Sequence, residues 1–352
     1  MQDTPSLDSQ RSRGDTHAAT LLAETRQRER LDPIGAAQAA YDAVITAAMR
    51  EGDQTVLAEA LRRRAVLSHE AGEDARARAG LQQSYAVASL LADSALAAEA
   101  LNTLGGLELE TGHLIAAEAA LTEALALARH RPDLTARIAQ NLGIVANIRG
   151  DHAGAELHYA QSLAAYTELG DDHGCALAHH NLGMVMADRG RWDLAEMHYV
   201  HCLELASTTG DAHLEALCLV NQAEALLALQ QLPAARRAAE AAGHTFMALA
   251  SRFDLADAER VLGLVELAEG KAAAAETRLR RAMQLARETD ARLTEAEAAR
   301  ELGRLYAESG RPAEARRFLG EAQRLFAKIG AAVDAAEVAA MLARFSGGSP
   351  TP

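Results

Sequence analysis

The chain has 352 residues, a formal net charge of −14 and an aromatic content of only 3%. Its acidic balance argues against nucleic acid or an anionic membrane surface as the main partner, because both carry negative charge themselves. Alanine is abundant in almost every segment, which favours closely packed helices and disfavours a protein built on β-sheets.

The predicted helices come in pairs that repeat about every 40 residues. A turn residue marks the loop inside each pair, at Gly72, Gly112, Gly150, Gly190, Gly270 and Gly310, with Asp32 in the equivalent place of the first pair and Gln230 in that of the sixth. Glycine suits these loops because its backbone reaches the left-handed conformation at little cost. The fixed period predicts a stacked array, since one such unit cannot bury its apolar face alone.

We expect eight helix hairpins and one capping helix, which together form a single solenoid over residues 16–345. The hairpins span 16–51, 52–92, 93–131, 132–171, 172–211, 212–251, 252–291 and 292–330, and the capping helix spans 331–345. Residues 1–15 and 346–352 lack the apolar residues of a packed core, so we expect them to be disordered.

Small and large residues alternate at fixed distances from each loop. Seven residues before it lies a small residue, namely Ala65, Gly105, Gly143, Gly183, Ala223, Gly263 or Gly303. Nine residues after it the side chain is usually large, namely Tyr41, Leu81, Leu121, Tyr159, Tyr199, Leu279 or Leu319, with Ala239 as the exception. Small residues let two helices approach closely, and the large residue is predicted to fill the space toward the neighbouring pair.

These columns carry a family resemblance. The first helices contain Leu142-Gly143, Leu182-Gly183, Leu262-Gly263 and Leu302-Gly303, and the second helices contain Ala155 with Tyr159 and Ala195 with Tyr199. The motifs resemble the tetratricopeptide repeat, and their spacing looks most like the longer variant found in bacterial signal-transduction regulators and peptide-binding scaffolds. The resemblance implies an all-α, right-handed superhelical solenoid of about eight antiparallel helix pairs with a C-terminal capping helix.

The resemblance also implies that the first helix of each pair lines a concave groove, and that the residue two before the Leu-Gly glycine points into it. In three consecutive pairs this residue is asparagine, at Asn141, Asn181 and Asn221. A primary amide both donates and accepts hydrogen bonds, so such a row could bind a peptide backbone. Neighbouring groove positions add Gln140, Asn147, His180, Met184 and Glu224. The sequence leaves open a second interpretation, in which the asparagines bond the adjacent helix and stabilise the stack.

The groove predicts function by binding. We expect a non-enzymatic scaffold or adaptor that holds a protein or peptide segment without a cofactor. The alternative is a peptide-responsive sensory regulator that acts on a transcription factor or kinase. A grip on a peptide's C-terminal carboxylate is disfavoured, because Arg137 is the only basic residue near the asparagines. The chain contains no GxxxxGK[ST], HExxH or GxSxG motif, so we predict no catalytic residue.

Cysteines and histidines leave a remote third possibility, an enzyme with a metal or thiol site. Cys175, Cys202 and Cys218 form no CxxC pair and are odd in number, which favours buried thiols in a reducing compartment. With no signal sequence and no membrane span, we expect a cytoplasmic protein. His158 and His198 lie one repeat apart, too far for a shared metal, and the nearby His198 and His201 lack further ligands, so we predict no metal site.

Overall fold

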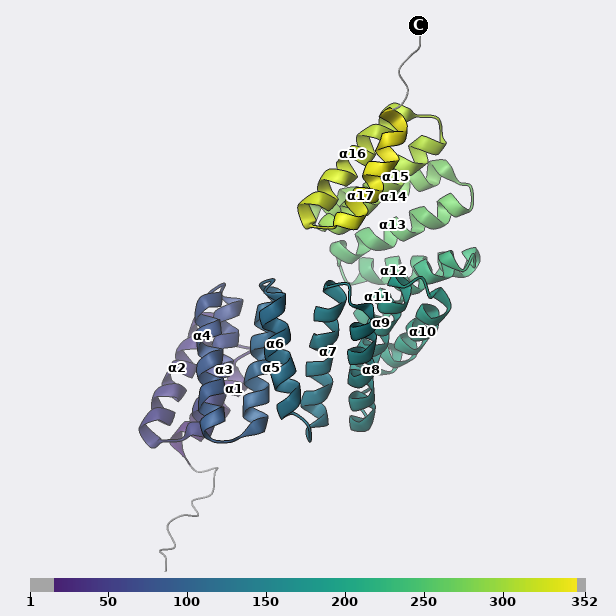
Figure 1. Ribbon diagram of the computed structural model, residues 1–352. Coiled ribbons are helices and arrows are strands. Elements are labelled where there is room, and N and C mark those ends of the chain that lie inside the picture. Colours follow the sequence, from purple (N-terminus) through teal and green to yellow (C-terminus); the bar gives the residue numbers. More distant parts are fainter. Residues whose placement is uncertain (1–15, 347–352) are drawn as a thin grey trace, which may run out of the picture. The chain divides into compact units, whose positions relative to one another are not determined.

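The computed structural model describes residues 16–346, with side chains through Arg344, and all regular secondary structure in that range is α-helical. The helices, shown in Figure 1, are α1 His17–Arg28, α2 Ile34–Glu51, α3 Gln54–Glu70, α4 Asp74–Leu90, α5 Ser94–Glu110, α6 Leu114–Leu127, α7 Pro132–Ile148, α8 His152–Leu169, α9 Asp172–Asp188, α10 Trp192–Thr209, α11 Ala212–Ala228, α12 Leu232–Ala248, α13 Arg252–Ala268, α14 Ala272–Glu288, α15 Arg292–Glu308, α16 Pro312–Ile329 and α17 Ala332–Ser346. The two predicted tails lie outside the described residues, apart from Ser346, which ends α17.

Helices α1 to α16 form eight antiparallel pairs, in which each odd-numbered helix packs against the even-numbered helix that follows it. Helix α17 packs against α16. The predicted fold class is therefore confirmed. The chain divides into two compact units, with the boundary between Asp171 and Asp172, so that the first unit contains α1–α8 and the second contains α9–α17. A single solenoid that continues through both units stays a prediction.

The predicted loop glycines adopt the left-handed backbone conformation, as Gly190 does with a φ of 70°. Gln230 has a φ of 61°, which confirms its place in the loop of the sixth pair. Asp32 lies in the loop between α1 and α2, which is its predicted place, but it lacks the positive φ of the other loop residues. The physical reason is Pro33, because the residue before a proline is pushed toward extended conformations.

Close approach within each hairpin depends on the glycines of the odd-numbered helices. A Cβ atom added to Gly143 would lie 2.5 Å from Cδ1 of Tyr159, and one added to Gly105 would lie 2.6 Å from Cδ2 of Leu121. The large residue thus lies directly over the glycine of its own hairpin. The sequence placed it only toward the neighbouring pair, which was incomplete, although Leu121 also shares a buried cluster with residues of α7.

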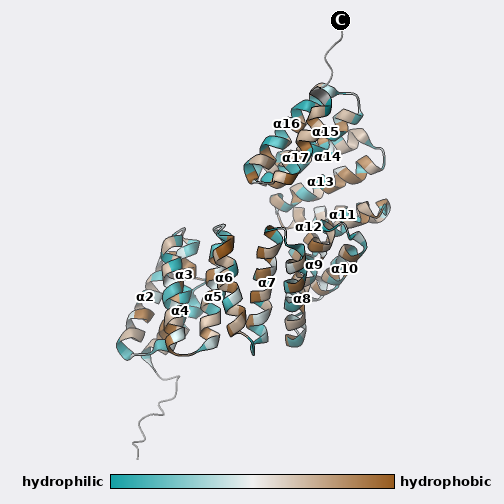
Figure 2. Cartoon of the chain, viewed as in Figure 1, coloured by the Kyte–Doolittle hydropathy of each residue, from teal (hydrophilic) through white to brown (hydrophobic). Residues whose placement is uncertain are grey.

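Buried apolar residues form clusters that run from one hairpin into the next. One cluster in the second unit joins Tyr306 of α15 and Phe326 of α16 to Val338 of the capping helix α17, and all three side chains are fully buried. Hydrophobic and hydrophilic residues are mixed along the helices (Figure 2), as expected of helices that hide one face and expose another. No described helix is long and apolar enough to cross a lipid bilayer.

Candidate functional site

A pocket of about 510 Å³ opens on the first unit. Apolar side chains from α3, α4, α5 and α7 line it, including Val66, Leu81, Leu107, Leu109 and Ile144. The polar residues that line it are His69, Asn102, Thr103, Glu110 and Asn141. We name it the amide pocket, because the primary amides of Asn102 and Asn141 both line it.

The two amides form a bridge between neighbouring odd-numbered helices. Asn141 on α7 donates a hydrogen bond from Nδ2 to Oδ1 of Asn102 on α5, at 3.0 Å. A primary amide has two donor hydrogens and an acceptor oxygen with two lone pairs, so one bond does not exhaust either group. Gln140 makes a different contact, since its Oε1 accepts a hydrogen bond from the Tyr166 hydroxyl at 3.1 Å.

Asn102 was missed at the sequence level, although a signal was present. It occupies the place in its repeat that Gln140 and His180 occupy in the next two, three residues before the small residue of the first helix. Extending that column back by one repeat would have included it. Its partnership with Asn141 depends on the packing of α5 against α7.

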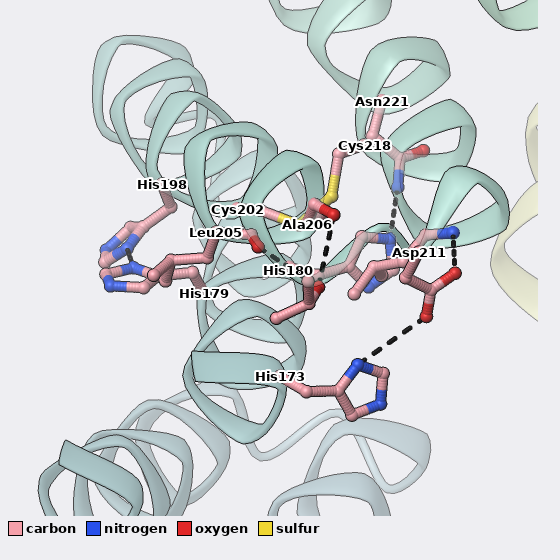
Figure 3. Close-up of a disulfide and its surroundings, with 12 residues drawn as sticks. His173, His179, His180, His198, Cys202, Leu205, Ala206, Asp211, Cys218 and Asn221 are labelled. Atoms are coloured by element: carbon pink, nitrogen blue, oxygen red, sulfur yellow. Dashed lines mark hydrogen bonds and ion pairs between the residues drawn. A yellow bond between two sulfur atoms is a disulfide. The ribbon is translucent and has the colours of Figure 1, made fainter. Parts of the chain in front are cut away.

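The second unit contains an equivalent bridge. Asn221 on α11 donates from Nδ2 to Nε2 of His180 on α9, at 2.9 Å (Figure 3). With the amide donating, Nε2 is the acceptor, so His180 is neutral and carries its proton on Nδ1. Burial lowers the pKa of His180, and a hydrogen bond with Asn181 opposes this shift. Met184, one turn further along α9, is 38% exposed.

Glu224, another predicted groove residue, belongs to an ion-pair network around Arg260. Glu224 on α11 binds the buried Arg260 guanidinium, Asp257 lies 2.7 Å from it, and Glu297 on α15 lies 3.3 Å from it. Burial alone would lower the pKa of Arg260, but the three carboxylates raise it. Burial also raises the pKa of Glu297 to about 7. This network surrounds one buried cation with three carboxylates, and the sequence did not predict it.

The two interpretations of the asparagine row can be compared within each unit. Asn141 and Asn221 each bond the preceding odd-numbered helix, which is the stabilising role that the sequence left open. Asn141 also lines the amide pocket. A ligand-binding role for Asn141, Asn181 and Asn221 stays a prediction. Asn147 contributes a buried Oδ1 atom that has no hydrogen-bond partner among the described residues.

A second pocket of the first unit, about 600 Å³ in volume, is polar. Its basic residues are Arg26, Arg62, Arg63 and Arg137. Arg137, the one basic residue that the sequence places near the asparagines, is thus one of four arginines around this pocket. Arg62 pairs with Glu99 at 2.8 Å and Arg63 pairs with Glu59 at 3.1 Å. Carboxylates of the chain itself therefore occupy these two arginines, which keeps a carboxylate grip disfavoured.

Cys202 on α10 and Cys218 on α11 form a disulfide (Figure 3). The prediction that all the cysteines are thiols is wrong for this pair. Their Cα atoms lie 6.5 Å apart because α10 packs against α11, and an odd number of cysteines does not prevent one pair from forming. Cys175 lies outside the disulfide and is buried, as predicted.

Histidines gather where α9 packs against α10. Nδ1 of His179 lies 3.0 Å from Nδ1 of His198, and the ring centroids of His179 and His201 lie 5.1 Å apart. Burial, together with the two neighbouring imidazoles, lowers the pKa of His179 to about 4. The sequence pointed to His198 and His201 but missed His179. Over residues 16–346, no three His, Cys, Asp or Glu side chains are placed to hold a metal ion.

A known family model matches part of the second unit. Residues 174–242 and 254–328 match the family model of the tetratricopeptide repeat. No curated protein sequence gives a match.

Solved structures show the same fold at low identity. BtubC from P. vanneervenii is 23% identical over 60% of this chain and 91% of that one, with a TM-score of 0.53. A signal transduction ATPase with a tetratricopeptide repeat sensor, from Pyrococcus horikoshii, is 16% identical over 90% of this chain and 48% of that one, with a TM-score of 0.67. A Rap protein complexed with Competence and Sporulation Factor is 15% identical over 94% of this chain and 97% of that one, with a TM-score of 0.58. Identities this low support a shared fold and nothing finer.

Proposed function

We propose that this chain, which is built of tetratricopeptide repeats, is a non-enzymatic scaffold that binds a protein or peptide segment on its odd-numbered helices. The amide pocket is the observation that carries the proposal. It combines apolar walls with two adjacent amides. Ligand sites typically bind apolar groups by burial and use a few placed polar groups to fix the orientation, and a peptide offers both kinds of group.

In this binding mode an apolar side chain of the partner is buried against Leu107, Leu109 and Ile144. A peptide N–H donates to one amide of the Asn102–Asn141 bridge, and a peptide C=O accepts from the other. The backbone contacts supply affinity that does not depend on the peptide sequence. The apolar pocket gives specificity for the size of one peptide side chain.

The rim of the amide pocket adds a preference for charge. His69 lies 2.6 Å from both Asp74 and Glu110, and the hydrogen bonds to Glu110 and Asp74 raise the pKa of its imidazole. Even a protonated His69 leaves one net negative charge on this group. A partner with a basic residue at the rim is therefore favoured.

In the second unit, we assign partner contact to Asn181, Met184 and Asn221. Met184 is exposed and flexible enough to fit an apolar side chain, and the amides again offer backbone hydrogen bonds. Glu224 is held by Arg260, so its part is to keep α11 and α13 in register.

The test begins with a display library of short unstructured peptides selected on the immobilised protein. The affinity of the tightest peptide is then measured for the wild type, Asn141→Leu and Ile144→Ala. A matched control is Gln82→Leu, at an exposed position of α4 that does not line the pocket. We expect each pocket variant to weaken binding about tenfold, or about 1.4 kcal/mol, which is the size of one lost hydrogen bond or of a partly lost apolar side-chain contact. Selected peptides that bind all variants equally would refute the proposal, provided that circular dichroism shows each variant folded.

A second candidate function is a peptide-responsive regulator that acts on a transcription factor or kinase. The division of the chain into two compact units favours it, because a ligand could bias their arrangement. Two of the similar structures are a signal transduction ATPase with a tetratricopeptide repeat sensor and a Rap protein complexed with Competence and Sporulation Factor. Small-angle scattering with and without the selected peptide distinguishes the two functions. A radius of gyration that changes on saturation supports the regulator, and an unchanged radius supports the passive scaffold.

A further inference from the structure

The second unit contains four equivalent junctions between one hairpin and the next helix. At each, a buried residue of the even-numbered helix and a buried residue sixteen positions later on the following odd-numbered helix occupy the same places. The pairs are Cys202 with Cys218, Ala242 with Ala258, Ala282 with Ala298, and Ala322 with Val338, and all eight residues are 0% exposed. Only the junction of α10 with α11 carries a covalent link.

Packing alone does not require this disulfide. The other junctions close with alanine or valine in the same places, inside apolar clusters of the same kind. The sulfur atoms lie in an apolar cluster with Ala176, Ala206 and Leu214. The disulfide is therefore an added constraint on one junction. Its position relative to the candidate site indicates which residues this constraint affects.

The linked helix α11 is the one that presents Asn221. Cys218 lies one turn before Asn221, whose amide bonds His180 on α9 (Figure 3). At the start of α11, Asp211 caps the helix by accepting from the Leu214 N–H at 3.0 Å, and it lies 3.6 Å from His173 on α9. Two polar contacts thus tie α11 to α9, while the disulfide ties it to α10.

We propose that the Cys202–Cys218 pair is a redox clamp on the peptide-binding face of the second unit. In the oxidised form the disulfide fixes α11 against α10, which holds Asn221 in register with His180. In the reduced form packing alone holds the junction, as it holds the alanine counterparts. Without the covalent link α10 and α11 separate more often, and peptide binding at Asn221 weakens. The link to binding rests on the proposed function, whereas the clamp itself does not.

The chemistry is two-electron thiol–disulfide exchange with a dithiol reductant. A thiolate of the reductant attacks one sulfur, forming a mixed disulfide and releasing the other cysteine as a thiolate, which takes a proton. The second thiol of the reductant then resolves the mixed disulfide, so the reductant becomes a disulfide and both cysteines become thiols. Because both cysteines are fully buried, the first attack requires local opening of the junction, and a bound peptide slows it.

The first measurement needs no ligand. Oxidised full-length protein is denatured and alkylated, and its intact mass should show one modified cysteine, against three after treatment with dithiothreitol. Hydrogen exchange of native protein should then show at least tenfold faster exchange in α10 and α11 after reduction, with α13 to α16 unchanged. Cys202→Ala/Cys218→Ala reproduces an alanine junction, so it should fold and exchange at the reduced rate under both conditions. Cys175→Ala is the matched control and should respond to dithiothreitol like the wild type.

Three modified cysteines in the oxidised protein, or equal exchange of α10 and α11 in both redox states, would overturn the clamp. A display-selected peptide shown to require Asn221 then tests the link to binding, and its affinity should fall at least threefold on reduction. If that affinity does not change with redox state, the link is overturned. If no peptide binds in either state, the proposed function fails while the exchange result still decides the clamp.

Discussion

Alanine substitutions at two adjacent glycines of α5 should move stability in opposite directions. Gly105 faces Leu121 of α6, and a Cβ atom added there would lie 2.6 Å from Leu121 Cδ2. A Cβ atom added to Gly106 would meet no atom within 4 Å. The two positions share one helix and one repeat, so Gly106→Ala is the matched control for Gly105→Ala.

The magnitudes follow from two opposing effects. Both variants gain about 1 kcal/mol from the higher helix propensity of alanine. Only Gly105→Ala must also displace Leu121, which is 0% exposed, and overpacking of this kind costs about 1–3 kcal/mol. The second hairpin buries Ala65 with Leu81, so a hairpin can adapt to a methyl group, and the lower half of that range applies. We therefore expect Gly106→Ala to stabilise by about 1 kcal/mol and Gly105→Ala to destabilise by up to about 1 kcal/mol.

Urea unfolding followed by circular dichroism measures both effects as shifts of the transition midpoint at constant slope. Combining Gly105→Ala with Leu121→Ala removes the clash, so Gly105→Ala should become stabilising in that background. Equal stabilisation by the two alanine variants in the wild-type background would refute the role assigned to the first-helix glycines.

Three further predictions concern the second unit. Gln230→Gly should stabilise by about 1 kcal/mol, because glycine adopts the φ of 61° without steric cost; a lower melting temperature would contradict this. Burial raises the pKa of Glu297 to about 7, so its contribution to stability declines as the pH rises from about 4.5 to 7. Glu297→Gln should thus stabilise by about 1–3 kcal/mol at pH 8 and by little at pH 5, and a pH-independent effect in urea titrations would count against the burial of that carboxyl. The pKa of His179 is lowered to about 4, so stability should be complete above pH 6.5 and fall by about 1–2 kcal/mol as the pH decreases to 4. His179→Gln should flatten that part of the profile, and an unchanged slope would exclude His179 as its source.

The repeat architecture was predictable because several independent sets of residues in the sequence repeat with the same period. The loop residues, the small residues of the first helices and the large residues of the second helices all give the same period, so even Gln230 could be placed without a glycine. Asp32 lies in the predicted loop but lacks a positive φ, because the proline that follows it favours extended conformations. Individual contacts within a hairpin were harder to predict from the sequence, because a large residue such as Tyr159 can contact both the glycine of its own hairpin and the next helix pair.

Contacts between repeats could not be predicted from the sequence, although the residues that make them occupy equivalent positions in the repeats. Cys202 and Cys218 have the same sixteen-residue separation as the alanine pairs, but that regularity gains meaning only once α10 and α11 are known to pack together. Arg260 is a similar case. Its carboxylate partners come from three helices, and a charge pattern along one helix does not reveal them.

The bridging bonds of the asparagine row are compatible with the proposed peptide-binding role of the same side chains. In both units the same relation recurs: the asparagine two residues before the small residue of one repeat bonds the residue three before it in the preceding repeat, as Asn141 does with Asn102 and Asn221 with His180. Each bond fixes the orientation of the amide and uses one of its two donor hydrogens. A bound peptide would then meet an amide whose rotamer is already set, which lowers the entropic cost of each backbone hydrogen bond. The bridging bonds therefore strengthen the case for a peptide-binding face, because they preorganise the groups that such a face would use.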